Sequence, residues 1–312
     1  MSQTFRATGI NLKAIPFGES DRLLTILTRE QGILRAVAPR ARKTKSELGG
    51  RADLFVVNQL LLTKGRSLYR ISQAETLKSY SGFSQNLGKL AAGQYFAELV
   101  LGQALSEQPQ DDLFLLLSEH LNRLERLSNS PGTETCSAVL TCLAHGTFHL
   151  LALAGLAPQV HLCCLTQRPV FPEIENAQWQ MGFSINSGGT VNLFDSNRTG
   201  TRNALQPQIA LESSSSYRSN GFDPAEVRIN ARLSATQVAL LQQLTLPELS
   251  DGLKSGQSLG IQQLNLPAPP ALSDWMMIER LLRQYAEYHL GRGIRSALLV
   301  DTFVQHSQYV SP

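Results

Sequence analysis

The chain has 312 residues, of which 42% are hydrophobic, 17% charged and 7% aromatic, a composition typical of a folded globular protein and not of a disordered one. No uninterrupted apolar run approaches the ~18 residues that cross a bilayer, and the N-terminus lacks a secretory pattern, so we expect a cytoplasmic protein. Four cysteines are too few for a disulfide framework and indicate reduced thiols.

The net charge of +3 is unevenly distributed along the chain. Residues 1–80 hold 14 Lys and Arg against 6 Asp and Glu, a balance of +8, whereas the remaining residues hold 14 against 19, a balance of −5. Such asymmetry predicts an N-terminal module that binds a polyanion and a near-neutral body behind it.

Residues 5–72 read as five short strands. Apolar residues alternate over 5–15, 22–28, 33–38, 54–63 and 68–72, and turn-forming residues separate these runs. Five strands without a helical pattern predict a small closed or nearly closed barrel over residues 1–82. An oligonucleotide-binding (OB) barrel is favoured, although an SH3-like barrel fits the strand count almost as well.

A cation-rich loop follows the third predicted strand. Arg40, Arg42, Lys43 and Lys45 fall within six residues. Such a loop can contact phosphates without sequence preference, or it can be a solvated turn, and the charge asymmetry favours phosphates. The predicted nucleic-acid-binding set adds flanking and neighbouring cations to these four: Arg35, Arg51, Lys64 and Arg66.

Aromatic side chains are a weaker signal in this region. Phe17, Phe55 and Tyr69 could stack on bases, but Tyr69 alternates with Ile71 and is expected to pack inside the barrel. We therefore expect backbone electrostatics to dominate. Neutralising about five phosphates of a single strand predicts a log–log salt slope of roughly −3.5.

The pattern becomes helical beyond residue 82. Residues 89–105 read as a first helix, and leucines from Leu113 to Leu127 form one apolar stripe of a second. Asp111 and Asp112 lie at the start of this stripe and Arg123 and Arg126 lie near its end, as the helix dipole favours. A third helix is expected after Ser130-Pro131. The three helices, joined by short polar loops, suggest a helical bundle.

Residues 159–230 interrupt the helical pattern. Strand-like pieces at 170–171 and 181–185 precede a Ser- and Asn-rich tract at 196–221 that we expect to be mobile. Helical periodicity resumes at residue 234 and continues in 273–290 and 294–303. We therefore expect a second domain over residues 83–312, mainly helical, with an irregular insert.

Arg283, Arg292 and Arg295, with His289, form a smaller basic set near the C-terminus. Compensation of helix C-terminal charge explains it as well as a second contact with DNA or with an acidic partner does.

No catalytic or metal site is predicted. His145 and His149 share one helical face with Cys142, but the surrounding residues are apolar, so a packed core pair is favoured over a metal site. Phosphate-binding loops, nucleophile elbows and paired carboxylates spaced for magnesium are absent from the sequence. The chain is expected to be a non-enzyme without cofactors.

Two separated stretches resemble one family. PFGESDRLLTILTREQGILRAVAPRARKTKSELGG, at residues 16–50, resembles the opening of RecO, a family of bacterial DNA-repair proteins and recombination mediators. LLRQYAEYHLGRGIRSALLVDTF, at residues 281–303, resembles its C-terminal signature. The order of the two stretches makes an accidental likeness improbable.

The chain departs from this family in two places. Many members have Ala-Lys-Gly-Ala-Arg where this chain has Ala38-Pro39-Arg40-Ala41-Arg42, so the geometry of the loop can differ while its charge is kept. Many members also carry a four-cysteine zinc ribbon. Cys163 and Cys164 stand where its first pair would fall, but residues 187–192, where the second would follow, contain no cysteine. We therefore expect a degenerate, metal-free ribbon at about 159–230, and zinc bound through Cys163, Cys164 and histidines is the alternative.

The resemblance implies a protein that binds single- and double-stranded DNA, anneals strands and helps to load recombinase. The implied partners are RecR, the acidic tail of the single-stranded-DNA-binding protein and, indirectly, RecA filaments. Arg123 and Arg126 are weak candidates for contacting that tail. The competing hypothesis is a protein–protein adaptor whose positive charge serves solubility.

Overall fold

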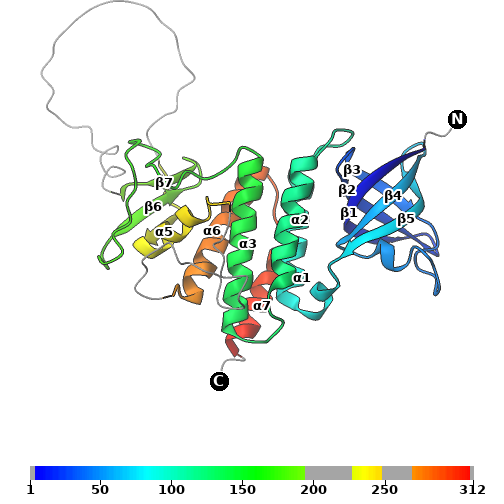
Figure 1. Cartoon of the computed structure of the whole chain (residues 1–312). Coiled ribbons are helices and arrows are strands. Elements are labelled where there is room, and N and C mark those ends of the chain that lie inside the picture. Colours follow the sequence, from blue (N-terminus) through cyan, green and yellow to red (C-terminus); the bar gives the residue numbers. More distant parts are fainter. Residues whose placement is uncertain (1–3, 194–226, 248–268, 310–312) are drawn as a thin grey trace, which may run out of the picture. The chain divides into compact units, whose positions relative to one another are not determined.

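The computed structural model describes residues 4–193, 227–247 and 269–309 (Figure 1). The tract at 196–221, predicted to be mobile, lies outside the described residues. The chain divides into two compact units, one of residues 1–157, 244–265 and 269–312 and one of residues 158–243 and 266–268. The domain boundary expected at residues 82–83 falls inside the first unit and stays a prediction.

The N-terminal region is one sheet of five strands: β1 (Thr4–Phe17), β2 (Asp21–Thr28), β3 (Gly32–Ala38), β4 (Val56–Lys64) and β5 (Tyr69–Ser79). The strand order is β1-β2-β3-β5-β4, and β4 pairs with β1, so hydrogen bonds close the sheet into a barrel. Only the short β3–β5 pair is parallel. Five strands followed by helices are what the sequence predicted, whereas the parallel pair was not predicted.

Alternating aliphatic side chains fill the barrel. Leu24, Ile26, Leu60 and Leu62 point inward and are at most 1% exposed, as the period of a β-strand requires. Strand β5 is longer than the run predicted at 68–72. Only two of its eleven residues are buried, so the second half of the strand carries almost no hydrophobic signal.

The helices of the first unit are α1 (Leu87–Gln103), α2 (Asp111–Arg126), α3 (Thr133–Leu153), α6 (Leu272–Leu290) and α7 (Ala297–Tyr309). Helix α3 lies at the centre and contacts the other four (Figure 1). By length and composition α3 could cross a membrane, but 72% of its apolar window is buried inside the protein. That burial is expected of the core helix of a bundle.

The second unit holds β6 (Gln180–Ser184), β7 (Gly189–Val191), β8 (Ala231–Ser234) and α5 (Ala235–Gln243). The three strands form one antiparallel sheet with β6 in the middle. The strand predicted at 181–185 is therefore present as β6. The piece predicted at 170–171 is not a strand, because the only pairing beside it is an isolated bridge between Leu162 and Pro169.

Candidate nucleic-acid interface

Residues 39–55 connect β3 to β4 and contain the cation-rich loop. The backbone folds into consecutive tight turns there. The Lys43 N–H donates to the Arg40 carbonyl at 2.9 Å, and the Ser46 N–H donates to the Lys43 carbonyl at 3.1 Å. Arg40 and Lys45 have φ angles of 57° and 75°, which side-chain-bearing residues seldom adopt. The loop therefore has a defined local shape.

Polar side chains of the barrel anchor both ends of this loop. Buried Asn11 and Asn58 each donate Nδ2 to the Arg51 carbonyl, at 2.8 and 2.9 Å. At the other end the Arg40 N–H donates to the Asp21 carboxylate at 2.8 Å, and this bond lowers the pKa of Asp21. The cations between the two anchors are thus held on a positioned backbone.

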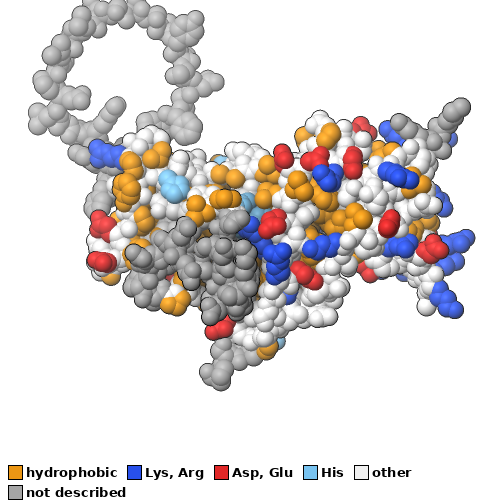
Figure 2. All heavy atoms as spheres, in the orientation of Figure 1, with side chains coloured by type: hydrophobic (Ala, Val, Ile, Leu, Met, Phe, Trp, Pro, Cys, Tyr) orange, Lys and Arg blue, Asp and Glu red, His pale blue; other side chains and the backbone are white. Residues whose placement is uncertain are grey.

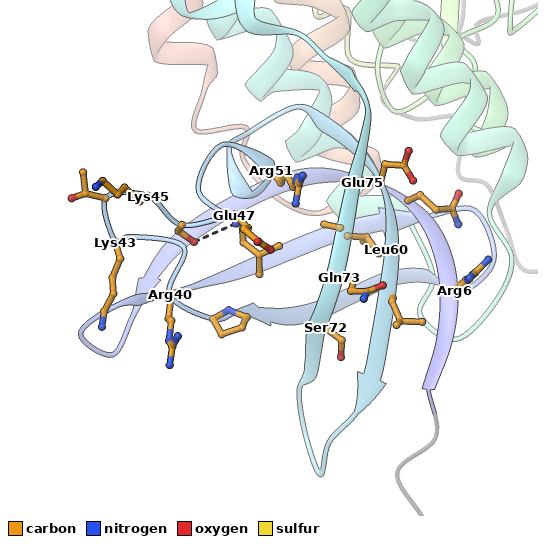
Figure 3. A pocket seen from close by; sticks show the side chains of 17 residues that line it. Arg6, Arg40, Lys43, Lys45, Glu47, Arg51, Leu60, Ser72, Gln73 and Glu75 are labelled. Atoms are coloured by element: carbon orange, nitrogen blue, oxygen red, sulfur yellow. Dashed lines mark hydrogen bonds between the residues drawn. The ribbon is translucent and has the colours of Figure 1, made fainter.

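A groove of about 900 Å³ lies beside the loop (Figure 3). One side is made by loop residues from Pro39 to Arg51, and the other by residues of β1, β4 and β5. Figure 3 shows Arg40, Lys43 and Lys45 on the loop side and Arg6 on the β1 side. The charged lining residues are Arg6, Arg40, Lys43, Lys45, Glu47, Arg51 and Glu75.

Positive charge predominates in this groove. Its lining holds five cations and two carboxylates. Arg40, Lys43 and Lys45 are exposed, and within the described residues their side chains form no ion pair. Figure 2 shows Lys and Arg side chains over the barrel on the face in view. Exposed cations that form no ion pair can bind a phosphate chain.

The eight predicted DNA-binding residues divide into two groups of four. The groove contains Arg40, Lys43, Lys45 and Arg51, and it does not contain Arg35, Arg42, Lys64 and Arg66. Arg35 is exposed on β3, and Arg66 is exposed in the turn after β4. Lys64 is also exposed, with its Nζ 3.9 Å from a Glu107 carboxylate oxygen. The structure therefore does not gather the whole set on one groove.

Arg42 lies within the loop but turns away from the groove. Its Nη1 donates to the carbonyl oxygens of Gly18 and Glu19, both at 3.3 Å. It lines a separate cavity of about 310 Å³ with Arg22 and Asp53. This geometry gives Arg42 a part in holding the β1–β2 turn.

Several groove residues were not identified from the sequence: Arg6, Gln59, Ser72, Gln73 and Glu75. Strand alternation was an available signal for Gln59, because its neighbours Asn58 and Leu60 are buried. Alternation gives the outward face of each strand, but it does not show which outward face adjoins the loop.

The secondary cations do not form one surface. Arg123 is 9% exposed, and its guanidinium bonds Glu119, His145 and the Pro247 carbonyl. The Arg283 side chain is 12% exposed and lies between the carboxylates of Glu279 and Asp301, at 2.8 Å from each. Arg126, Arg292 and Arg295 are exposed.

The candidate stacking aromatics differ in accessibility. Phe55 is 1% exposed and packs on Phe83 with ring centroids 5.4 Å apart, so it cannot stack on a base. Tyr69 packs edge-on against Phe5 at the barrel core, as the alternation predicted. Phe17, at the end of β1, is 42% exposed.

Three histidines meet in the helical region. Ligand nitrogens of His120, His145 and His149 lie within 4.8 Å of one another, and burial lowers the pKa of each, to about 3 for His145. His145 Nδ1 accepts from Arg123 at 2.8 Å, and its Nε2 donates to the Leu246 carbonyl at 2.9 Å. Because both nitrogens of His145 are used and the Arg123 guanidinium lies alongside, the site disfavours a metal cation.

Cys163 is 2% exposed in the second unit, and the Asn192 N–H donates to its Sγ at 3.3 Å. Burial raises the pKa of the Cys163 thiol, but hydrogen bonds from backbone N–H groups, including those of Asn192 and Thr166, outweigh burial and hold the pKa below its ordinary value. In the part of the chain that the structure describes, neither Cys163 nor Cys164 belongs to a cluster of three potential metal ligands. The Cys163 sulfur, which would be a zinc ligand in a ribbon, thus accepts hydrogen bonds from the protein.

Comparisons with known proteins cover nearly the whole chain. The model of the recombination protein O N-terminal region matches residues 1–80, and that of its C-terminal region matches residues 84–255. The chain is 48% identical over 305 residues to the DNA repair protein RecO of Trichodesmium erythraeum, covering 98% of this chain and 96% of that one. It is 50% identical over 302 residues to that of Acaryochloris marina, covering 97% and 96%.

Proposed function

The chain belongs to the RecO family of DNA repair proteins, and from this premise we propose that the barrel holds DNA by its phosphate backbone along the groove beside the β3–β4 loop. One observation carries the proposal: Arg40, Lys43 and Lys45 lie on one groove, exposed and without ion pairs among the described residues. Arg6 and Arg51 extend this positive lining. The family is one of non-enzymatic recombination mediators.

The strand order supports an OB-type barrel. A ring of β1-β2-β3-β5-β4, with a parallel β3–β5 pair, is the arrangement expected of that fold. OB barrels bind oligonucleotides across their sheets and through their connecting loops. The long β3–β4 loop would here supply the cations. The turn at Cys163 would be the remnant of a zinc ribbon, held by hydrogen bonds in place of metal.

Annealing would follow from charge neutralisation. Two single strands repel one another through their phosphates, and cations on one surface reduce this repulsion and raise the local concentration of strands. Binding of single- and double-stranded DNA, strand annealing and help in loading recombinase in DNA repair make up the proposed activity, in the cytoplasm at the nucleoid.

The proposed protein partners follow from the family. They are RecR, the acidic tail of the single-stranded-DNA-binding protein and, indirectly, RecA filaments. Arg126 is an exposed cation at the end of α2 that could meet an acidic tail. Arg123 is a poorer candidate, because its guanidinium is already bonded inside the protein.

The experiment reverses charge in the groove and compares it with charge reversal elsewhere on the barrel. Lys43→Glu with Lys45→Glu should weaken binding to a single-stranded oligonucleotide at least tenfold, because two phosphate contacts become repulsive. The salt slope should move from roughly −3.5 toward roughly −2, since each phosphate contributes about 0.7. Lys13→Glu, at an exposed β1 position outside the groove, is the matched control.

Fluorescence anisotropy and annealing of complementary oligonucleotides across a salt series would measure both effects. Unchanged annealing in the folded double variant would overturn the proposal. Loss of RecR binding with DNA binding intact would favour the adaptor hypothesis.

A further inference from the structure

We infer that the groove takes a single strand with its phosphates along the cationic edges and its base edges against the polar residues between them. This inference rests on the proposed function, since it states which form of DNA the groove selects and how. It concerns the side of the groove that is formed by the outward face of β1, β4 and β5, opposite the cation-rich loop.

The strand register puts polar and charged groups in defined rows on that face. Arg6 on β1 is paired with Leu61 on β4, which is paired with Gln73 on β5. Two residues further along the strands and on the same face, Gln59 on β4 lies opposite Glu75 on β5. Both rows line the groove. Figure 3 shows Gln73 and Glu75 between the loop cations and Arg6.

Neutral amides are suited to bases more than to phosphates. An amide offers both a donor and an acceptor, which is what the edge of an unpaired base requires. The Thr8 hydroxyl donates to Gln59 Oε1 at 3.3 Å, which sets the Gln59 amide nitrogen as the donor available to a ligand. Ser72, between Ile71 and Gln73 at a register shift, adds a hydroxyl to the same lining.

The carboxylate of Glu75 is the most informative group. A phosphate placed against it would be repelled, so the backbone of a bound strand should keep to the cationic edges. The exocyclic amino groups of bases are donors, and an acidic side chain can accept from the N4 amino group of cytosine. Glu75 therefore fits the base side of a single strand and does not fit a phosphate chain.

Duplex DNA cannot use this arrangement fully. Its Watson–Crick edges are already paired, and its perimeter presents phosphates, which can meet Arg40, Lys43 and Lys45 but not the middle of the groove. Among the residues that the structure describes, those lining the groove include no aromatic side chain. Base contacts here would be hydrogen bonds and not stacking, so they distinguish unpaired bases from paired ones.

The test compares three ligands of equal length: a mixed-sequence single strand, an abasic strand with the same phosphates, and a duplex. The wild-type protein should bind the single strand at least about fivefold more tightly than the abasic strand. Gln59→Ala with Gln73→Ala should abolish this difference and leave duplex affinity unchanged. Glu175→Gln, an exposed substitution outside the groove, is the control.

Glu75→Gln provides a second, conservative readout. It should raise affinity for the abasic strand, because a repulsive charge is removed, and it should reduce any preference for oligo-dC over oligo-dT to about one, because thymine lacks the amino donor. Equal wild-type affinity for abasic and normal strands would overturn the inference and leave phosphate binding intact. Failure to bind any of the three ligands would instead overturn the proposed function.

Discussion

Cations occur in two contrasting settings in the first unit of this protein. On the barrel, Arg40, Lys43 and Lys45 are exposed on a groove and form no ion pair among the described residues. In the helical region, Lys89 is 1% exposed and Arg283 lies between two carboxylates. Both groups consist of Lys and Arg, but the groove cations are open to a ligand whereas Lys89 and Arg283 are held by groups within the protein.

The difference shows that charge in a sequence is not the same as charge available to a ligand. A buried cation must find partners, because an unpaired charge in the protein interior is costly. Lys89 Nζ meets that need by donating to the carbonyl oxygens of Glu125 and Leu127, at 3.2 and 2.6 Å. A surface cation has no such requirement and remains available to phosphates.

The largest expected effect comes from breaking the internal network. Arg283→Met should lower the free energy of unfolding by about 3–5 kcal/mol, because Glu279 is 4% exposed and would lose its partner. Urea denaturation followed by circular dichroism would measure it. Adding Glu279→Leu should recover most of the loss, since the uncompensated carboxylate is then gone. A single variant as stable as wild type would break the contrast.

Removing the buried charge of Lys89 should lower the free energy of unfolding by less than removing that of Arg283, and again because buried groups lose their partner. Lys89→Met keeps the length of the side chain and removes the ammonium that holds the carbonyl groups at the end of α2. We expect a loss of about 2 kcal/mol in the free energy of unfolding, the usual range for charged hydrogen bonds. Lys13→Met on the barrel surface is the matched control and should change stability by less than about 0.5 kcal/mol.

Acid should weaken the helical region through its buried histidines. The folded pKa values of His120, His145 and His149 lie below 6.5, so the unfolded chain binds protons that the folded chain does not. The contribution of each histidine to stability is present above pH 6.5 and is lost as the pH falls from there toward its own folded pKa, which is about 3 for His145. Each histidine should lower the unfolding free energy by up to about 1.4 kcal/mol per pH unit.

Denaturation series between pH 7.5 and 4.5 would measure this slope. His120→Leu should make this slope shallower by the share of one proton. Within the described residues both ring nitrogens of His120 lack a hydrogen-bond partner, so the substitution removes no bond seen there. An identical slope in the variant would show that His120 does not titrate as its burial requires.

The smallest expected effect on stability belongs to the groove. Lys43→Gln and Lys45→Gln should each change the free energy of unfolding by less than about 0.5 kcal/mol, because both side chains are exposed and no interaction within the described part of the chain depends on them. Thermal melting would test it. A loss above 1 kcal/mol would mean that these lysines support the loop and are not free for phosphates.

Much of the barrel was readable from the sequence. Strand alternation gave β1 to β4 within about two residues, because inward-facing residues such as Leu24 and Ile26, or Leu60 and Leu62, alternate with less buried neighbours. Strand β5 was cut short for the same reason. Its second half buries only Ala74, so its extent depends on hydrogen bonds to β4 that leave no hydrophobic pattern.

The candidate site was readable only in part. The density of cations between β3 and β4 pointed to the loop, and the bias of the first 80 residues pointed to the barrel. Sequence proximity did not show that Arg42 braces the β1–β2 turn while Arg40 lines the groove. It also did not bring in Arg6, which is more than 30 residues from the loop and reaches the groove through the pairing of β1 with β4.

The sequence alone determined the β-rich beginning, the helical remainder and the concentration of positive charge near the N-terminus, because these depend on composition and on local periodicity. The tertiary structure decided which cations are free. Arg123 and Arg283 each have a glutamate four residues earlier on the same helix. Their remaining partners, the Pro247 carbonyl for Arg123 and Asp301 for Arg283, are distant along the chain, and only folding brings them within bonding distance.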